Sequence, residues 1–198
     1  MAAMSAPEFD SAVLAALARW PAVPAVAGWL SLTARGQWRL RGEPIGNAAI
    51  AAFIGRNYAG DGQGRWFFQN GPQRVYVALE VTPWVYRLQP DGVVTHSGRR
   101  PRALHAALLL DDGRMVIDTD LGAGVIDDRD TAALTKALVD PAGAPLGDAA
   151  LSDWLAGDDR AWLDAVGLAL AGGRVPVERS VAAALEARFG FVRQPVVD

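Results

Sequence analysis

Three residues whose side chains could bind a ligand alternate along one predicted strand. Arg74, Tyr76 and Glu80 lie at even positions of the segment RVYVALEV. Successive side chains of a strand point to opposite sides, so these three share one face. A cation, a phenol and a carboxylate on one face suit a small polar or anionic ligand, particularly beside an aromatic wall such as Trp66.

Two further residues complete this candidate ligand-binding set. Arg56 and Asn57 lie near the end of a helix predicted over 48–58, and we expect them in a cleft between two halves of the chain. The alternative is structural: Val75 and Leu79 form an apolar core face, and the even-numbered face is simply covered by other elements. The sequence leaves both interpretations open.

A second constellation suggests phosphoryl transfer or hydrolysis. Asp118 and Asp120 follow the apolar run Met115–Ile117, and a strand that ends in Asp-x-Asp can place a nucleophile beside a magnesium ligand. Here the pair follows a hairpin pattern in mid-chain. We therefore favour turn aspartates and keep a metal-dependent enzyme as the alternative.

Other catalytic and cofactor patterns are missing from the sequence. There is no cysteine, and the two histidines, His96 and His105, have no zinc-site spacing. The glycine-rich segment GRNYAGDGQGR lacks the Lys-Ser/Thr of a phosphate-binding loop. We expect no cofactor, no metal and no catalytic residue.

The first half of the chain reads as helix, strand pair, helix and further strands. Ser5 and Glu8 form a capping-box pattern for a helix over 7–19, and Asn47 is a predicted N-cap for a helix over 48–58. Strands are expected around 29–32, 38–40, 66–68, 74–81, 84–89 and 93–98. Because Pro72 follows Asn70-Gly71, we expect a wide loop over 69–73 instead of a tight hairpin.

The second half repeats this plan. A strand–turn–strand unit over 107–119 precedes a helix through Leu134 and Leu138, helices carry Trp154 and Trp162, and a last hairpin and a short helix ended by Gly190 follow. The basic run 99–102 is a predicted linker. We expect an α+β fold with two packed subdomains of mostly antiparallel sheet, 1–98 and 99–198, related by an internal structural repeat.

Composition limits the partners. Of the 198 residues, 51% are hydrophobic and 21% charged, which indicates a folded globular protein. The net charge of −3 argues against nucleic acid and anionic membranes as partners. Acidic residues stand where a signal peptide needs positive charge, and no uncharged run is long enough to span a bilayer. We expect a cytoplasmic protein, of oligomeric state that the sequence leaves undefined.

The segments from Gly36 to Ile45 (G-x-W-x-x-x-G-x-P-I), then F-I-x-R-N-Y and GRWFFQNGPQRVYVALEVTP, resemble an uncharacterised proteobacterial family similar in layout to domain-of-unknown-function family 1285. The resemblance covers about residues 28–90. It implies a two-part α+β fold of repeated strand–helix–strands units, without an established enzymatic activity, and with a ligand-binding or signalling role at the junction. Of the candidate residues, only Glu80 is implied by it.

Three functions are therefore left open. The leading hypothesis is a non-catalytic module that binds a small ligand or a protein partner and has a regulatory or signalling role. The first alternative is the metal-dependent hydrolase or phosphoryl-transfer enzyme built on Asp118 and Asp120. The second is a protein–protein adaptor that uses exposed tryptophans.

Overall fold

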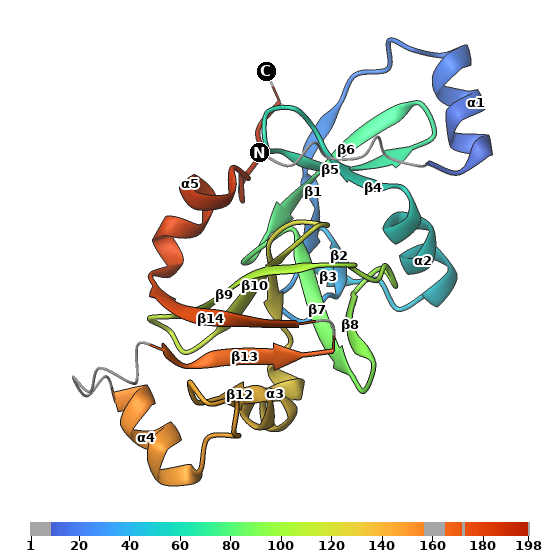
Figure 1. The fold of residues 1–198 in the computed structure, drawn as a ribbon. Helices are drawn as coiled ribbons and strands as arrows, with labels where there is room; N and C mark the ends of the chain where they lie inside the picture. Colours follow the sequence, from blue (N-terminus) through green and yellow to red (C-terminus); the bar gives the residue numbers. More distant parts are fainter. Residues whose placement is uncertain (1–8, 157–164, 172, 198) are drawn as a thin grey trace.

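The computed structural model describes residues 9–156, 165–171 and 173–197. The protein has an α+β fold with two mixed, mostly antiparallel sheets of six and eight strands and several short helices (Figure 1). The predicted fold class is confirmed. Ser5, Pro7, Glu8 and Trp162 lie outside the described residues, so the capping box and one tryptophan-bearing helix are not part of this description.

The six-stranded sheet comes from the first part of the chain. Its order is β3-β2-β1-β6-β5-β4, and all neighbours are antiparallel except β1 and β6. The strands are β1 (Val26–Leu32), β2 (Trp38–Leu40), β3 (Glu43–Pro44), β4 (Tyr58–Gly60), β5 (Trp66–Asn70) and β6 (Gln73–Leu79). Helix α2 (Ala48–Arg56) connects β3 to β4, and helix α1 (Ser11–Arg19) precedes the sheet.

The eight-stranded sheet has the order β12-β13-β14-β9-β10-β11-β7-β8. Its strands are β7 (Trp84–Gln89), β8 (Gly92–Thr95), β9 (Leu104–Leu110), β10 (Met115–Thr119), β11 (Gly124–Ile126), β12 (Leu138–Val139), β13 (Gly167–Leu170) and β14 (Gly173–Ser180). The helical segments are η1 (Asp128–Asp130), α3 (Thr131–Ala137), α4 (Asp148–Ala156), η3 (Ala182–Ala184) and α5 (Leu185–Phe189). Helices α3 and α4 lie at the end of this sheet and α5 at its side (Figure 1).

The predicted internal repeat is present as a repeat of topology. In the first sheet, the meander β1-β2-β3 leads through a helix to the meander β4-β5-β6, whose last strand pairs in parallel with β1. In the second sheet, β9-β10-β11 leads through η1 and α3 to β12-β13-β14, and β14 pairs in parallel with β9. Each unit thus closes by the same parallel pairing of its first and last strands.

The hairpin β7–β8 falls outside this repeat. It follows β6 in the chain but joins the second sheet, where β7 pairs in parallel with β11. The change from one sheet to the other therefore falls at residues 80–83, ahead of the basic run 99–102. A division of the chain into domains 1–98 and 99–198 stays a prediction.

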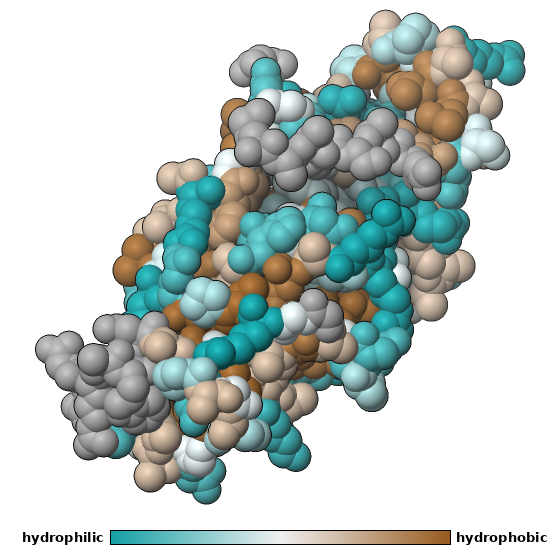
Figure 2. All heavy atoms as spheres, in the orientation of Figure 1, coloured by the Kyte–Doolittle hydropathy of each residue, from teal (hydrophilic) through white to brown (hydrophobic). Residues whose placement is uncertain are grey.

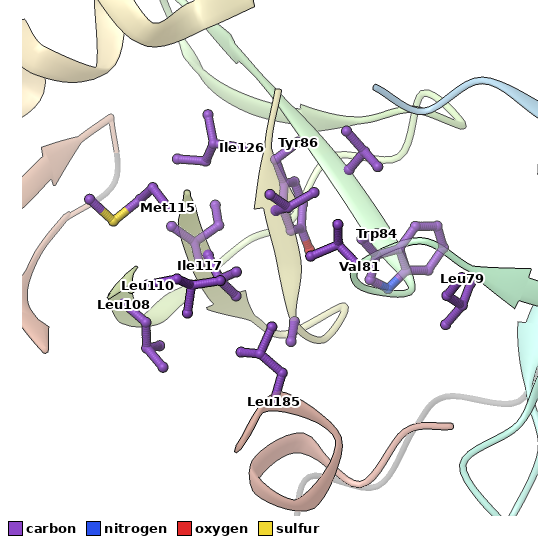
Figure 3. Packing of buried hydrophobic residues seen from close by; sticks show 14 of the residues in the cluster. Leu79, Val81, Trp84, Tyr86, Leu108, Leu110, Met115, Ile117, Ile126 and Leu185 are labelled. Carbon is purple, nitrogen blue, oxygen red and sulfur yellow. The ribbon is translucent and has the colours of Figure 1, made fainter. Parts of the chain in front are cut away.

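One hydrophobic cluster extends through both sheets (Figure 3). Leu79 of β6 and Trp84 of β7 belong to the same cluster as Leu108 of β9 and Ile117 of β10, and all four are almost fully buried. Burial of apolar side chains is the main favourable contribution to folding, so this shared core holds the two sheets together. On the outer face of the first sheet, Ala59, Phe67 and Tyr76 form a small separate cluster.

Local predictions have mixed outcomes. The Asn47 side chain accepts hydrogen bonds from the N–H groups of Ala49 and Ile50, which confirms the N-cap. Gly190 ends α5 with a φ of 66°, as glycine does at many helix ends. The described part of the 7–19 helix begins only at Ser11.

The wide loop predicted over residues 69–73 is wrong. Asn70 pairs with Gln73, which leaves a two-residue loop of Gly71 and Pro72, with a φ of 57° at Gly71. The N–H that closes such a turn belongs to the residue after the loop, so Pro72 loses nothing by lacking one. Glycine at the first loop position supplies the positive φ that a tight hairpin needs.

Hydrophobic residues reach the surface over the middle of the molecule and are bordered there by hydrophilic ones (Figure 2). No helix within the described ranges combines the length and the apolar character needed to cross a membrane.

Candidate functional site

The six residues of the candidate ligand-binding set lie in four different places. Arg74 and Tyr76 are on the outer face of the first sheet, and Trp66 is inside the core. Arg56 and Asn57 bind the start of α1, and Glu80 lies beyond the end of β6, at the junction of the sheets. The structure therefore brings together pairs of these residues and does not gather all six around one cavity.

The side-chain alternation of β6 is confirmed. Val75, Val77 and Leu79 point into the shared core, while Tyr76 lies on the opposite face in the small outer cluster. On that face the guanidinium of Arg74 lies 4.0 Å from the ring centroid of Phe67. Arg74 is thus placed by an aromatic ring of the neighbouring strand.

Tyr76 is tied to the loop between β4 and β5. Its hydroxyl donates to Asp61 Oδ2 at 3.2 Å, and the guanidinium of Arg65 lies 4.5 Å from its ring centroid. Arg65 Nε also donates to Asp61 Oδ2 at 2.9 Å. Burial acts to raise the pKa of Asp61, but hydrogen bonds from the Gln63 N–H and from Arg65 outweigh it and hold that pKa below its usual value. Tyr76 is only 3% exposed, so a ligand could reach little more than the edge of its ring.

Arg56 and Asn57 serve to anchor α1. Asn57 is fully buried; its Oδ1 accepts from the N–H of Asp10 at 2.8 Å, and its Nδ2 donates to Asp10 Oδ2 at 3.1 Å and to the carbonyl of Phe53 at 2.9 Å. Arg56 donates to the same carboxylate. Both side chains are therefore committed to a contact between α2 and the segment ahead of α1.

Trp66 and Glu80 also have structural partners. The ring centroid of Trp66 lies 5.0 Å from that of Tyr58 and 5.1 Å from that of Trp84. Glu80 Oε2 accepts a hydrogen bond of 2.9 Å from the N–H of Ala34, in the turn between β1 and β2. This turn approaches the second sheet.

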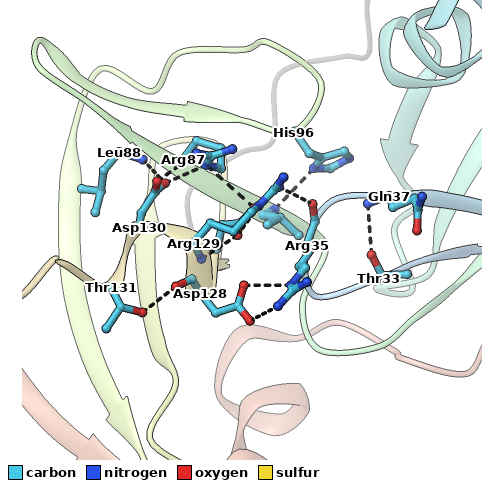
Figure 4. Close-up of polar contacts among 12 residues, drawn as sticks. Thr33, Arg35, Gln37, Arg87, Leu88, His96, Asp128, Arg129, Asp130 and Thr131 are labelled. Atoms are coloured by element: carbon cyan, nitrogen blue, oxygen red, sulfur yellow. Dashed lines mark hydrogen bonds and ion pairs between the residues drawn. The ribbon is translucent and has the colours of Figure 1, made fainter. Parts of the chain in front are cut away.

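Two ion pairs meet at η1, and one of them crosses from the first sheet (Figure 4). Arg35, in the turn between β1 and β2, donates to both carboxylate oxygens of Asp128 at 2.9 and 2.7 Å. Arg87 of β7 donates to both oxygens of Asp130 at 2.7 and 2.9 Å, and the N–H of Leu88 adds a third hydrogen bond. Polar contacts thus reinforce the junction at η1.

The two aspartates of the enzyme alternative have different environments. Asp118 Oδ2 lies 3.8 Å from His105 Nδ1, and burial raises the pKa of Asp118. Asp120 instead accepts hydrogen bonds from the N–H groups of Arg102 and Ala103 at 2.8 and 3.1 Å. Within the described ranges, no three His, Cys, Asp or Glu side chains are grouped so that they could hold a metal ion.

The ring of His96 is placed in the core, which the sequence did not predict. Its ring lies among Trp38, Tyr58 and Trp84, with centroid separations of 5.2, 5.9 and 5.6 Å. Nδ1 accepts a long hydrogen bond of 3.3 Å from the N–H of Val85, and Nε2 is buried without a partner, alone in this respect among the described side chains. The aromatic rings around it belong to the core or pack against it, so we assign its ring to the core.

A cavity of about 220 Å³ lies beside the basic run 99–102, the predicted linker. It is lined by the start of β8, the loop before β9, the end of β10 and the end of β13: Asp91, Gly92, Val93, Arg100, Pro101, Arg102, Ala103, Leu104, Thr119, Leu170 and Ala171. The signal for this site was present as the tight basic cluster Arg-Arg-Pro-Arg, but which elements the fold brings beside it could not be read from the sequence.

The two arginines of this cavity differ in their contacts. Arg100 NH1 donates to Asp91 Oδ2 at 2.9 Å. The Arg102 guanidinium is exposed, and no hydrogen bond, ion pair or ring contact holds it among the described residues. A second hollow, of about 370 Å³ beside the start of α4, is lined by Asp140 and mostly apolar residues and has no basic side chain.

The two-sheet α+β fold is also that of a solved DUF1285 family protein from Silicibacter pomeroyi DSS-3, with a TM-score of 0.52 and 15% identity over 89% of this chain and 91% of that one. A DUF1285 family protein from Shewanella baltica OS155 matches 52% of this chain and 87% of its own at 18% identity, with a TM-score of 0.40. The expected likeness to DUF1285 proteins is confirmed for the fold.

The model of the family described as "Protein of unknown function (DUF2946)" matches residues 9–196. The chain belongs to this family. No curated protein matches this chain.

Proposed function

We propose that this protein is a non-catalytic regulatory module of the cytoplasm that binds a small anionic ligand in the cavity beside Arg100 and Arg102. The observation that carries the proposal is that Arg102 lines a partly open cavity and its guanidinium has no carboxylate partner among the described residues. Arginine presents five N–H donors in a planar fork that matches carboxylate and phosphate oxygens.

The size and walls of the cavity support a compact ligand. A volume of about 220 Å³ is below the roughly 300–1,000 Å³ of drug-sized ligand sites. Val93, Leu104 and Leu170 provide apolar walls, which lower the local polarity and so strengthen charge–charge attraction. A phosphate or carboxylate group with a few carbon atoms fits these features.

Titration calorimetry with orthophosphate tests the proposal, with pyrophosphate and citrate as larger probes. We expect binding by the unmodified protein, at least tenfold weaker binding by Arg102→Ala, and partial recovery in Arg102→Lys, because lysine keeps the charge but loses the fork. Arg39→Ala is the matched control, since Arg39 is an exposed arginine of the first sheet. No binding by the unmodified protein, or equal binding by Arg102→Ala, would overturn the proposal.

The candidate ligand-binding set around Arg74 stays a separate proposal. Arg74 supports it best, because its guanidinium rests on Phe67 and has no carboxylate partner among the described residues. A ligand bound there would meet the outer face of the first sheet. Loss of orthophosphate binding in Arg74→Ala but not in Arg102→Ala would move the site to this face.

A further inference from the structure

Asp91 lies at the same cavity as the two arginines and carries the opposite charge. It belongs to the two-residue turn between β7 and β8, and its Oδ2 is 2.9 Å from Arg100 NH1. Both side chains are more than half exposed, at 69% for Asp91 and 54% for Arg100. The protein's own carboxylate thus occupies one of the two cationic groups that line the cavity, while Arg102 has no such partner among the described residues.

We infer that Asp91 competes with the ligand for Arg100 and is displaced when the ligand binds. The ligand therefore carries two negative charges, one for each arginine. This inference rests on the proposed function. A ligand with a single charge gains from Arg102 but meets the carboxylate of Asp91 at the same cavity. A dianion, such as a phosphate monoester, can engage both guanidinium groups once Asp91 has moved away.

The position of Asp91 allows this displacement. Exposed ion pairs are weak, since solvent screens the charges and ordering two side chains costs entropy. Asp91 lies between Pro90 and Gly92 in an exposed turn, and Gly92 has a φ of 133°, a conformation open mainly to glycine. The carboxylate can rotate into solvent without disturbing the pairing of Gln89 with Gly92 that closes the hairpin.

The expected consequence is that removing the competitor strengthens binding. Asp91→Asn keeps the size of the side chain and removes its charge, so we expect three- to tenfold tighter binding of orthophosphate or sulfate. In an Arg100→Ala background, the same substitution should have a much smaller effect, because the group for which Asp91 competes is gone. Acetate, a monoanion, should bind far more weakly than sulfate to the unmodified protein.

Asp112→Asn is the matched control. Asp112 is a turn aspartate that pairs with Arg114 between β9 and β10, so the control changes the net charge equally but does not alter the lining of the cavity. Titration calorimetry at fixed salt compares the variants. If the unmodified protein binds orthophosphate and Asp91→Asn binds no more tightly than Asp112→Asn, the inference about Asp91 is wrong while the proposed function stands. If neither the unmodified protein nor Asp91→Asn binds any of the anions, both fail.

Discussion

The imidazole of His96 lies against the indole of Trp84, with ring centroids 5.6 Å apart, at the position where the β7–β8 hairpin meets the core of both sheets. His96 as a residue keeps some exposure, but its Nε2 is buried and has no hydrogen-bond partner. A protonated imidazole there would be a buried charge among aromatic rings. The fold therefore requires the neutral form of His96.

This requirement predicts a loss of stability in mild acid. Burial, with a smaller contribution from the Arg99 cation, lowers the pKa of His96 from 6.5 to about 3. Because the folded-state pKa is depressed, the unfolded chain binds the proton first. The stabilisation is complete above pH 6.5 and falls as the pH drops from there towards 3, by at most about 1.4 kcal/mol per pH unit.

Urea unfolding of His96→Asn between pH 4 and 8 checks this. The variant should be less stable than the unmodified protein at pH 8, and the difference between them should shrink in acid. His105→Asn is the control for the loss of a histidine, because His105 is exposed. A constant difference between His96→Asn and the unmodified protein over this range would contradict the assignment.

The carboxylates at the junction of the sheets should differ in their contribution to stability. The Asp130 carboxylate accepts three hydrogen bonds and is 11% exposed, whereas the Asp128 carboxylate, among the described residues, pairs with Arg35 alone and is 60% exposed. Asp130→Asn should lower the free energy of unfolding by about 1–3 kcal/mol, and Asp128→Asn by less than about 1 kcal/mol. Equal losses in urea unfolding would show that the Leu88 and Arg87 contacts do not matter.

The contribution of the Asp130–Arg87 ion pair to stability should also depend on pH. Hydrogen bonding to Arg87, together with the Leu88 N–H, holds the pKa of Asp130 below its usual value. A depressed folded-state pKa means that the contribution of Asp130 is present above its ordinary pKa and is lost as the pH falls through the folded value. The difference between Asp130→Asn and the unmodified protein should therefore be largest near pH 7 and decrease below pH 4.

Gly124 should not tolerate a side chain. A Cβ at this position of β11 would lie 2.4 Å from the ring of Tyr86, on the neighbouring strand β7. Gly124→Ala is expected to lower stability by about 1–3 kcal/mol, because a tightly packed core must shift to accept a methyl group. Gly46→Ala, where no atom lies within 4 Å, is the control and should stay within about 0.5 kcal/mol. Thermal melts of both variants measure these changes, and equal melting temperatures would contradict the expected clash at Gly124.

For the candidate ligand-binding set, loss of ligand binding must be separated from loss of stability. Arg74→Ala removes the contact with Phe67, and Glu80→Ala removes the hydrogen bond to the Ala34 N–H; both contacts are partly exposed, so each variant should lose less than about 1 kcal/mol. Thermal melts without ligand measure this. Melting several degrees lower in both variants would make these residues structural and end the ligand proposal for them.

The enzyme alternative has its own test. A carboxylate site for Mg²⁺ on Asp118 and Asp120 would raise the melting temperature as magnesium is added, since a metal that binds only the folded state stabilises it. The two side chains have separate partners, so we expect no shift, either in the unmodified protein or in Asp118→Asn. A magnesium-dependent rise that Asp118→Asn abolishes would favour the enzyme.

Features set by neighbouring residues could be predicted from the sequence. The alternation of Val75 and Val77 with Tyr76, the Asn47 cap and the Gly190 helix end depend on nearby residues alone. The echo between the two halves also pointed correctly to a repeat, because both units begin with a strand–turn–strand pattern.

The candidate site was harder to predict, for a physical reason. Alternation tells which residues share a face, but not what covers that face. Arg56 and Asn57 lie next to each other in sequence, yet their function is fixed by Asp10, 46 and 47 residues away. The cavity beside Arg102 forms only when the loop before β9 meets the end of β13, a pairing that no local pattern encodes.

The β7–β8 hairpin has a consequence for how this chain is made. As synthesis proceeds from the amino terminus, the first sheet can close once β6 has emerged, but β7 has only β8 beside it until β11 follows about 40 residues later. During that interval an apolar hairpin is exposed on the nascent chain, which makes this stage the natural point for a chaperone to act or for misassembly to begin. A gene cut at the basic run would leave the same hairpin permanently without its sheet.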